Sequence, residues 1–427
     1  MSAPPAIPPA PPDEWDAVTD TFVGGNQVQL LQGGDALFPA MQQAMAAARS
    51  EVWLETYIFH DDAAGQAVLA ALRDAAGRGV AVHLLVDGFG SLAALPWLRA
   101  ALADSSVQLQ VFRPLERWTA WLQPSQLRRL HHKVCVVDDE VAFVGGINIL
   151  DDRFDLSHGL SERPRLDFAV ALRGPVVPQV RRHAQALGAR IRVLGQDWRS
   201  EVGALARSRH PMAQTLQLWR EMRASTAAPP ANDDDRPVRA AFVVRDNLRQ
   251  RRAIERRYIA AVRGARQQVD IACPYFYPRR AFRCSLQAAA RRGVRVRLLL
   301  QGKIDYRLAA LAARVLYGEL LADGVRIFEY TPAFLHAKVA VVDGRWATVG
   351  SSNIDPLSLL LNLEANVVVL DEAFAAVLRQ RLDAAMADAQ EVQRPPLRGG
   401  WLGWLSRGFV AWCANTYLRV AGIAGRY

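Results

Sequence analysis

Short runs of apolar, largely β-branched residues alternate along this chain with longer runs in which apolar residues recur at helical spacing. In the first half, strands are expected at residues 28–32, 52–59 and 80–86, and helices at residues 36–48 and 64–76. The strand runs are short and bounded by turn residues, whereas the helical runs extend over more than three turns. Strands that alternate with helices in this way predict an α/β fold.

The same order of elements returns in the second half of the chain. A strand is expected at residues 269–276, and residues 288–300 repeat the helix, glycine stop and strand of residues 75–86. A further strand at residues 325–330 corresponds to one at residues 107–112. Because the correspondence extends over several elements, it predicts two duplicated lobes and not merely a repeated motif.

One polar pattern recurs at identical spacing within these apolar runs. Residues 131–148 read HHKVCVVDDEVAFVGGIN, and residues 336–353 read HAKVAVVDGRWATVGSSN. In each copy a histidine is followed two residues later by a lysine, seven later by an aspartate, and then by a small-residue pair and an asparagine. The motif residues are His131, Lys133, Asp138 and Asn148 in the first copy and His336, Lys338, Asp343 and Asn353 in the second.

The side chains of this pattern suit a phosphate group. A histidine and a lysine two residues apart on a strand emerge on one face, about 7 Å apart, and the small pair lets a backbone approach a bound group. One histidine can attack phosphorus and the other can protonate the leaving oxygen, while lysines and asparagines hold the negative charge. Asp138 and Asp343 belong to the motif, but their position at a strand end fits turn formation. The arrangement requires no metal ion, and no cofactor is expected.

The pattern HxKxxxxD, followed by six residues and G(G/S)xN, resembles the signature of the phospholipase D superfamily. Its presence twice resembles the two-lobed branch, and residues 346–353, 355–358 and 362–366 resemble the bacterial cardiolipin synthases, particularly the B type. The resemblance covers roughly residues 18–390. It implies two duplicated phospholipase D-like α/β sandwich lobes with the active site at their pseudo-twofold interface.

The resemblance also implies roles for individual residues. It makes His131 the nucleophile that forms a phosphohistidine and His336 the general acid and base, although the near symmetry of the two copies leaves the reverse order open. Lys133, Lys338, Asn148 and Asn353 are expected to bind phosphate oxygens. Asp167 and Glu364, which follow the two histidines by 36 and 28 residues, are expected to orient them; the alternative is that each is a polar residue at a strand edge.

The implied activity joins two phosphatidylglycerol molecules into cardiolipin and releases glycerol. One alternative is a phosphodiesterase of the same superfamily that hydrolyses phospholipid or nucleic acid. Another is a membrane scaffold with an inactive site, although the intact histidines, lysines and asparagines argue against it.

The net charge limits the classes of partner, and the cysteine spacing bears on metal binding. The 427 residues carry a net charge of +10, which favours an anionic partner, either lipid headgroups or nucleic acid. The four cysteines are scattered without CxxC pairing, which argues against a cysteine zinc site. With the resemblance, the expected partners are phosphatidylglycerol and other anionic phospholipids at a membrane surface, and no nucleic acid is expected. The protein is expected peripherally on the cytoplasmic face of the bacterial inner membrane, and its oligomeric state is not predicted.

Composition also suggests domain boundaries. Residues 1–17 are proline-rich and are expected to be a disordered leader. Residues 223–237 have the composition of a linker between a first lobe at 18–222 and a second lobe at 238–392. Residues 393–427 are aromatic and basic without an acidic residue, which favours a membrane-associating tail over a segment packed on the protein.

Two further arginine-containing segments are candidates for lipid contact. Residues 113–130 have no counterpart of similar length in the second half and are predicted to form a loop or short helix over the active site. The alternative is a helix packed on the first lobe. Residues 245–257 are expected on a helix, with a solvated face as the default and lipid contact as the alternative.

Overall fold

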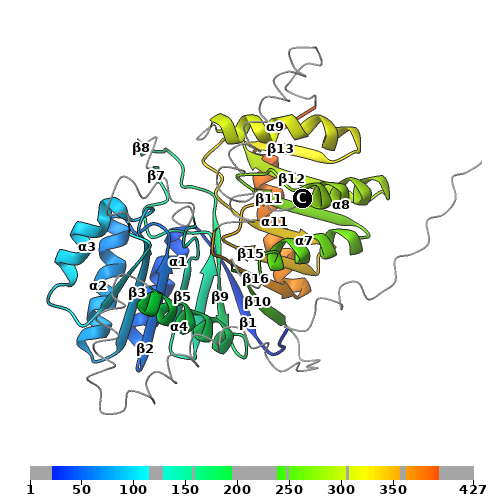
Figure 1. Ribbon diagram of the computed structural model, residues 1–427. Helices are drawn as coiled ribbons and strands as arrows, with labels where there is room; N and C mark the ends of the chain where they lie inside the picture. Colours follow the sequence, from blue (N-terminus) through cyan, green and yellow to red (C-terminus); the bar gives the residue numbers. More distant parts are fainter. Residues whose placement is uncertain are drawn as a thin grey trace, which may run out of the picture.

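The computed structural model describes residues 22–114, 128–155, 159–194, 238–246, 250–303, 307–355 and 362–393. Its elements form two lobes that lie side by side, the first blue to green and the second green to orange in Figure 1. The expected leader and linker, all but the first residue of the expected tail, and residues 115–127 of the segment predicted over the active site lie outside the described residues.

The first lobe is built on a seven-stranded mixed sheet with the order β1-β9-β6-β5-β2-β3-β4. Helices α1, α2 and α3 share an apolar core with one face of the sheet, and α4 covers the other face. The elements are β1 (Gln27–Gln32), α1 (Gly34–Ala47), β2 (Glu51–Thr56), α2 (Ala63–Gly77), β3 (Ala81–Asp87), η2 (Leu92–Ala94), α3 (Leu95–Leu102), β4 (Gln108–Phe112), β5 (Val134–Val137), β6 (Val141–Gly145), the small hairpin β7 (Phe154–Asp155) and β8 (Gly159–Leu160), β9 (Phe168–Arg173) and α4 (Val177–Leu194).

The second lobe repeats this sheet strand for strand in the order β10-β16-β15-β14-β11-β12-β13, and β17 adds one edge strand. This repetition confirms the predicted α/β fold with duplicated lobes. The elements are β10 (Arg239–Arg245), α7 (Ala253–Gly264), β11 (Gln268–Cys273), α8 (Arg280–Arg291), β12 (Arg295–Gln301), α9 (Arg307–Ala322), β13 (Arg326–Tyr330), β14 (Val339–Val342), β15 (Trp346–Gly350), β16 (Glu364–Leu370), α11 (Glu372–Ala387) and β17 (Gln390–Glu391).

Helix α2 shows how local sequence sets these elements. Its apolar residues Val68 and Leu72 lie one turn apart and are fully buried. Asp62 caps the helix by accepting a hydrogen bond from a first-turn backbone N–H. After the helix, Gly79 adopts φ +89°, a left-handed conformation that L side chains rarely adopt, and Gly293 does the same at φ +90° after α8. The glycine stop is therefore duplicated together with the helix and strand it separates.

The two lobes meet across one continuous apolar core. This core includes buried residues of α4, such as Val180 and Leu187, together with residues of α11, such as Phe374 and Leu378. Strands β9 and β1 lie beside β16 and β10 at the centre of the molecule (Figure 1). Burial of apolar surface from both lobes in one cluster holds them as a single unit.

Two segments differ from the arrangement that the sequence suggests. Val23, which precedes the first strand of the first lobe, pairs with Ala240 of β10 in the second lobe through hydrogen bonds of 3.0 and 2.9 Å. The expectation of a helix over residues 245–257 is wrong at its start, because Arg245 completes β10 opposite Glu364 and is 1% exposed. Apolar residues run without a break through this strand, so the preceding β-structure extends to include the arginine. Helix α7 begins only at Ala253.

None of the helices in the described ranges combines the length and the apolar character needed to cross a bilayer.

Candidate active site

The two motif histidines lie at the junction of the lobes, where backbone hydrogen bonds cross between them. His131 lies just before β5, and its N–H donates to the carbonyl oxygen of Leu363 in the second lobe at 3.0 Å. His336 lies just before β14, and its N–H donates to the carbonyl oxygen of Leu166 in the first lobe at 2.9 Å. Each histidine is therefore positioned by the chain that leads into a strand of the opposite lobe.

The carboxylates that hold the imidazoles also come from the opposite lobe. His131 Nδ1 lies 2.9 Å from Glu364 Oε2, and His336 Nδ1 lies 2.6 Å from Asp167 Oδ2. All four side chains are at least four-fifths buried. A carboxylate at Nδ1 fixes the tautomer in which Nε2 carries the lone pair. The active site is thus two interlocked half-sites, neither of which is complete within one lobe.

The motif lysines and asparagines border the same site. Lys133 Nζ donates to the carbonyl oxygen of His131 at 2.9 Å, and Lys338 Nζ donates to that of His336. Asn148 Oδ1 accepts a hydrogen bond from the N–H of Ile58 at 3.2 Å. Because this contact occupies the amide oxygen, the NH2 group of Asn148 is the end that can donate to a phosphate oxygen.

Burial lowers the pKa of each basic group in the site. It lowers the pKa of His131 to about 4, against the opposing effect of Glu364, and it lowers the pKa of His336 well below its usual value. The pKa of Lys133 falls to about 7 and that of Lys338 to about 8 for the same reason. Both imidazoles are therefore neutral near pH 7, and the lysines can be charged by an arriving phosphodiester, whose negative charge favours the ammonium form.

The two carboxylates differ in their electrostatics. Burial raises the pKa of Asp167 to about 7. Burial acts in the same direction on Glu364, but His131, Lys133 and a hydrogen bond from Ser351 outweigh it and lower the pKa of that carboxyl. Near neutral pH, the His336–Asp167 pair is therefore protonated to a greater extent than the His131–Glu364 pair.

The small-residue pair of the motif explains part of this difference. In the second copy, Ser351 Oγ donates to Glu364 Oε2 at 2.5 Å. The equivalent residue in the first copy is Gly146, which has no hydroxyl, and a Cβ at this position would lie 2.3 Å from Asp167 Oδ1. The pair was predicted to make room for a bound group, but here Gly146 makes room for the carboxylate that holds His336.

The motif aspartates lie at the opposite ends of their strands from the lysines. Asp138 accepts hydrogen bonds from the backbone N–H groups of residues 49–51 at 2.9–3.0 Å. Asp343 accepts from residues 266–268 at 2.8–2.9 Å. Both have positive φ, near 50°, in the hairpin turn. These contacts tie each motif hairpin to the start of the neighbouring strand and do not reach the histidines.

Asp138→Ala should therefore destabilise the protein without removing its chemistry. Loss of three backbone hydrogen bonds at a partly exposed turn is expected to lower the free energy of unfolding by about 1–2 kcal/mol, measured by urea unfolding. Asp139→Ala is the matched control, because Asp139 is adjacent and half-exposed and forms an ion pair with Arg181 at the surface. A folded Asp138→Ala protein that loses transfer activity as completely as a histidine variant would contradict this structural role.

The site includes residues that the motif does not reveal. Asp87 is buried at the carboxyl end of β3 and accepts a hydrogen bond from the N–H of Leu130 at 2.9 Å, next to His131, and burial raises its pKa to about 6. Tyr57 directly follows β2, and its ring centroid lies 5.0 Å from that of His131. The position of Asp87 at the carboxyl end of a parallel strand could have indicated a site residue, because ligands of α/β proteins bind at that end of the strands.

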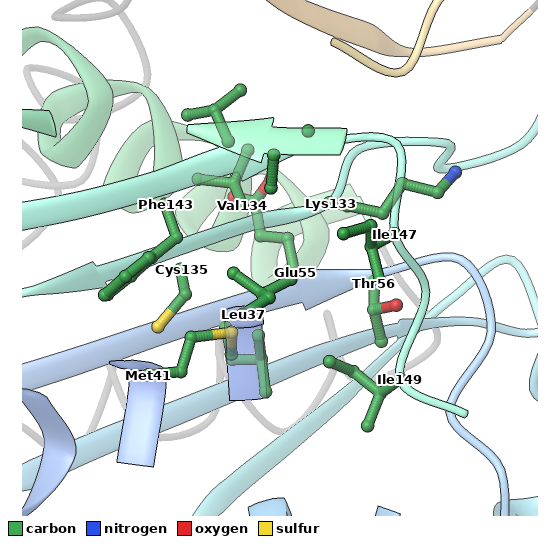
Figure 2. Close-up of a pocket in the computed structure, with 14 residues that line it drawn as sticks. Leu37, Met41, Glu55, Thr56, Lys133, Val134, Cys135, Phe143, Ile147 and Ile149 are labelled. Atoms are coloured by element: carbon green, nitrogen blue, oxygen red, sulfur yellow. The ribbon is translucent and has the colours of Figure 1, made fainter. Parts of the chain in front are cut away.

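A small pocket lies between helix α1 and the first-lobe sheet, beside Lys133. Figure 2 shows the lysine at its edge, with the nitrogen directed away from apolar side chains such as Met41, Phe143 and Ile149. The volume of the pocket is about 20 Å³, which is room for about one water molecule. It is too small to hold a lipid tail.

Comparison with known proteins agrees with the geometry of the site. The sequence family described as "Cardiolipin synthase, PLD-like domain" matches twice, at residues 41–160 and 258–386. The chain is 36% identical over 382 residues to cardiolipin synthase B of Escherichia coli strain K12, a match that covers 88% of this chain and 85% of that protein. It is 32% identical over 377 residues to cardiolipin synthase A of Pseudomonas fluorescens strain SBW25, with coverage of 88% and 72%.

A solved structure shares the fold across almost the whole chain. The crystal structure of phosphatidylserine synthase from Haemophilus influenzae Rd KW20 superposes with a TM-score of 0.64 at 12% sequence identity and covers 96% of this chain and 99% of that chain. At this identity the similarity concerns the fold alone.

Proposed function

The chain belongs to the phospholipase D-like cardiolipin synthases, and from this premise we propose that it transfers a phosphatidyl group from one phosphatidylglycerol molecule to a second and releases glycerol. The observation that carries the proposal is the pair of buried histidines, each held at Nδ1 by a carboxylate of the opposite lobe. Two neutral imidazoles at one junction suit a double displacement, in which one forms a covalent bond to phosphorus and the other moves protons.

In the first half-reaction, His131 Nε2 attacks the phosphorus of the donor lipid. A nitrogen–phosphorus bond forms, and the bond from phosphorus to the glycerol headgroup oxygen breaks. When Asp167 is protonated and faces Nδ1, neutral His336 carries its proton on Nε2, and it gives this proton to the departing oxygen. The two carboxylates support this order, because ionised Glu364 keeps the Nδ1 proton of His131 in place while the pair of His336 and Asp167 holds a proton to higher pH. Glycerol leaves, and the phosphatidyl group remains on His131.

In the second half-reaction, a headgroup hydroxyl of the acceptor phosphatidylglycerol attacks the phosphohistidine. His336 now accepts the hydroxyl proton, a new oxygen–phosphorus bond forms, and the bond to His131 breaks. Lys133, Lys338, Asn148 and Asn353 would hold the non-bridging oxygens in both steps, and each such donor contributes on the order of a few kcal/mol to transition-state stabilisation. The products are cardiolipin and one glycerol per cycle.

The proposed setting is the surface of an anionic membrane, with the protein peripheral on the cytoplasmic face. The net charge of +10 supports it, because anionic lipids attract basic proteins from the aqueous side. Both substrates and the product are lipids, so catalysis at the bilayer surface delivers the donor and the acceptor to the site from one phase.

Vesicles containing phosphatidylglycerol with a labelled headgroup test the proposal. We expect the purified protein to produce cardiolipin and labelled glycerol in a 1:1 ratio, measured by lipid mass spectrometry and glycerol release. Phosphatidylcholine vesicles are the control. Phosphatidic acid as the main lipid product would show a hydrolase instead, and cleavage of DNA without lipid turnover would show a nuclease.

A further inference from the structure

A second group of titratable side chains lies where helix α4 packs on the first-lobe sheet. Glu55 comes from β2, His132 directly follows the catalytic His131, and His183 comes from α4. They are 0%, 1% and 8% exposed, respectively. His132 Nδ1 lies 2.9 Å from Glu55 Oε2, and the ring centroids of His132 and His183 are 5.1 Å apart. The three residues thus form one buried polar cluster between the sheet and the helix.

This cluster has more polar atoms than the surrounding protein satisfies. Glu55 Oε1, His132 Nε2 and both ring nitrogens of His183 are buried without a hydrogen-bond partner among the described residues. A buried polar atom without a partner is unfavourable, and native proteins contain few of them. Four at one place indicate that a bound species completes the cluster.

We propose that Glu55, His132 and His183 together bind one divalent transition-metal ion, with Zn²⁺ as the best match. One potential ligand atom from each residue lies within 4.8 Å of the other two. Ligands about 2.0–2.2 Å from Zn²⁺ are separated by about 3.3 Å in a tetrahedron, so the three side chains reach that geometry by small rotations. Two imidazoles and one carboxylate favour zinc and its neighbours over Ca²⁺ or Mg²⁺, which prefer oxygen ligands.

The environment of His183 supports a ligand role. The residue is 8% exposed, and neither ring nitrogen has a hydrogen-bond partner among the described residues, so both are available as ligand atoms. On its other side, the ring packs edge-on against Phe242 of β10 in the second lobe at 5.6 Å. The site therefore lies at the lobe junction, although it does not face the reacting groups.

The ion would act as a structural link. It would join β2, the segment that leads into β5, and α4, and so hold in place the backbone that carries His131. It would supply no chemistry to phosphoryl transfer, because its ligands lie on the other side of the sheet segment from the substrate. The proposal does not depend on which lipid the enzyme uses.

Metal titration of the untagged full-length protein tests the site. After removal of bound metal with a chelator and dialysis, we expect one equivalent of Zn²⁺ to bind by calorimetry and to raise Tm in a concentration-dependent manner. His183→Gln should weaken zinc binding at least about 100-fold, since it removes a direct ligand. His83→Gln is the matched control. His83 lies on the neighbouring strand β3, where its ring stacks on Trp53, and it is not part of the cluster.

His183→Cys distinguishes coordination from a general loss of structure. This variant should retain the site with a thiolate ligand, and Co²⁺ should then give a sulfur-to-metal charge-transfer band that is absent from the wild-type complex. Failure of wild-type protein to bind Zn²⁺, or equal binding by His183→Gln and His83→Gln, would overturn the proposal. The cluster would then be a hydrogen-bonded pair of His132 and Glu55 solvated by buried water.

Discussion

Replacing His131 with alanine should abolish the covalent lipid–phosphate adduct and lower the transfer rate by about 10⁴-fold or more. We expect His336 not to replace the proposed nucleophile, because Asp167 holds its Nδ1 and this pair serves as the acid. His336→Ala should lower the rate to a similar degree with phosphatidylglycerol, because the glycerol oxygen then leaves without a proton. The two variants therefore look alike with the natural substrate.

A donor with a nitrophenol headgroup separates the two roles. Nitrophenolate leaves without protonation, so His336→Ala should still release it in a burst and accumulate the adduct, whereas His131→Ala should release none. Mass spectrometry of quenched protein locates the adduct on one imidazole. His60→Ala is a suitable control, since this histidine is partly exposed and pairs with Asp62 outside the reacting pair. An adduct on His336 in the His131→Ala protein would reverse the assignment.

The sequence predicted the architecture well because duplication leaves a visible period. The two motif copies, the glycine stops at Gly79 and Gly293 and the matching strand runs all depend on local sequence, and the two sheets repeat one order. The position of Arg245 was mispredicted because a run of arginines suggests a solvated helix. Its burial depends on pairing between β10 and β16, which lie more than a hundred residues apart.

The composition of the active site was predictable, but its connectivity was not. His131 and Glu364 are 233 residues apart, and His336 and Asp167 are 169 apart. The spacing within each copy pairs each carboxylate with the histidine of its own lobe. In the structure, each histidine instead contacts the carboxylate of the opposite lobe. The difference between Gly146 and Ser351 is visible in the sequence, but its effect on the carboxylates appears only when the distance from Ser351 to Glu364 is known.

The exchange of carboxylates between lobes leads to the second large effect. Glu364→Gln removes the charge that holds the Nδ1 proton of His131, so we expect adduct formation to fall by roughly 10²- to 10⁴-fold with either phosphatidylglycerol or the nitrophenol donor. Asp167→Asn acts on His336, and it should slow the reaction with phosphatidylglycerol by a similar factor but have little effect with the nitrophenol donor. If the carboxylates served the histidines of their own lobes, the two outcomes would be exchanged.

The pH dependence of the same reactions gives an independent readout. In the proposed mechanism, the first half-reaction with phosphatidylglycerol needs the proton shared by His336 and Asp167, and burial raises the pKa of Asp167 to about 7. Burial also lowers the pKa of Lys133 to about 7 and that of Lys338 to about 8. Loss of these protons should make the wild-type rate fall as pH rises from about 7 to above 8. The nitrophenol donor should lose the part of this decline that belongs to Asp167 and retain the part that belongs to the two lysines, because they still hold the phosphate charge. Single-turnover rates over this pH range measure the decline with each donor. Identical pH profiles for the two donors would mean that the proton shared by His336 and Asp167 takes no part in departure of the leaving group.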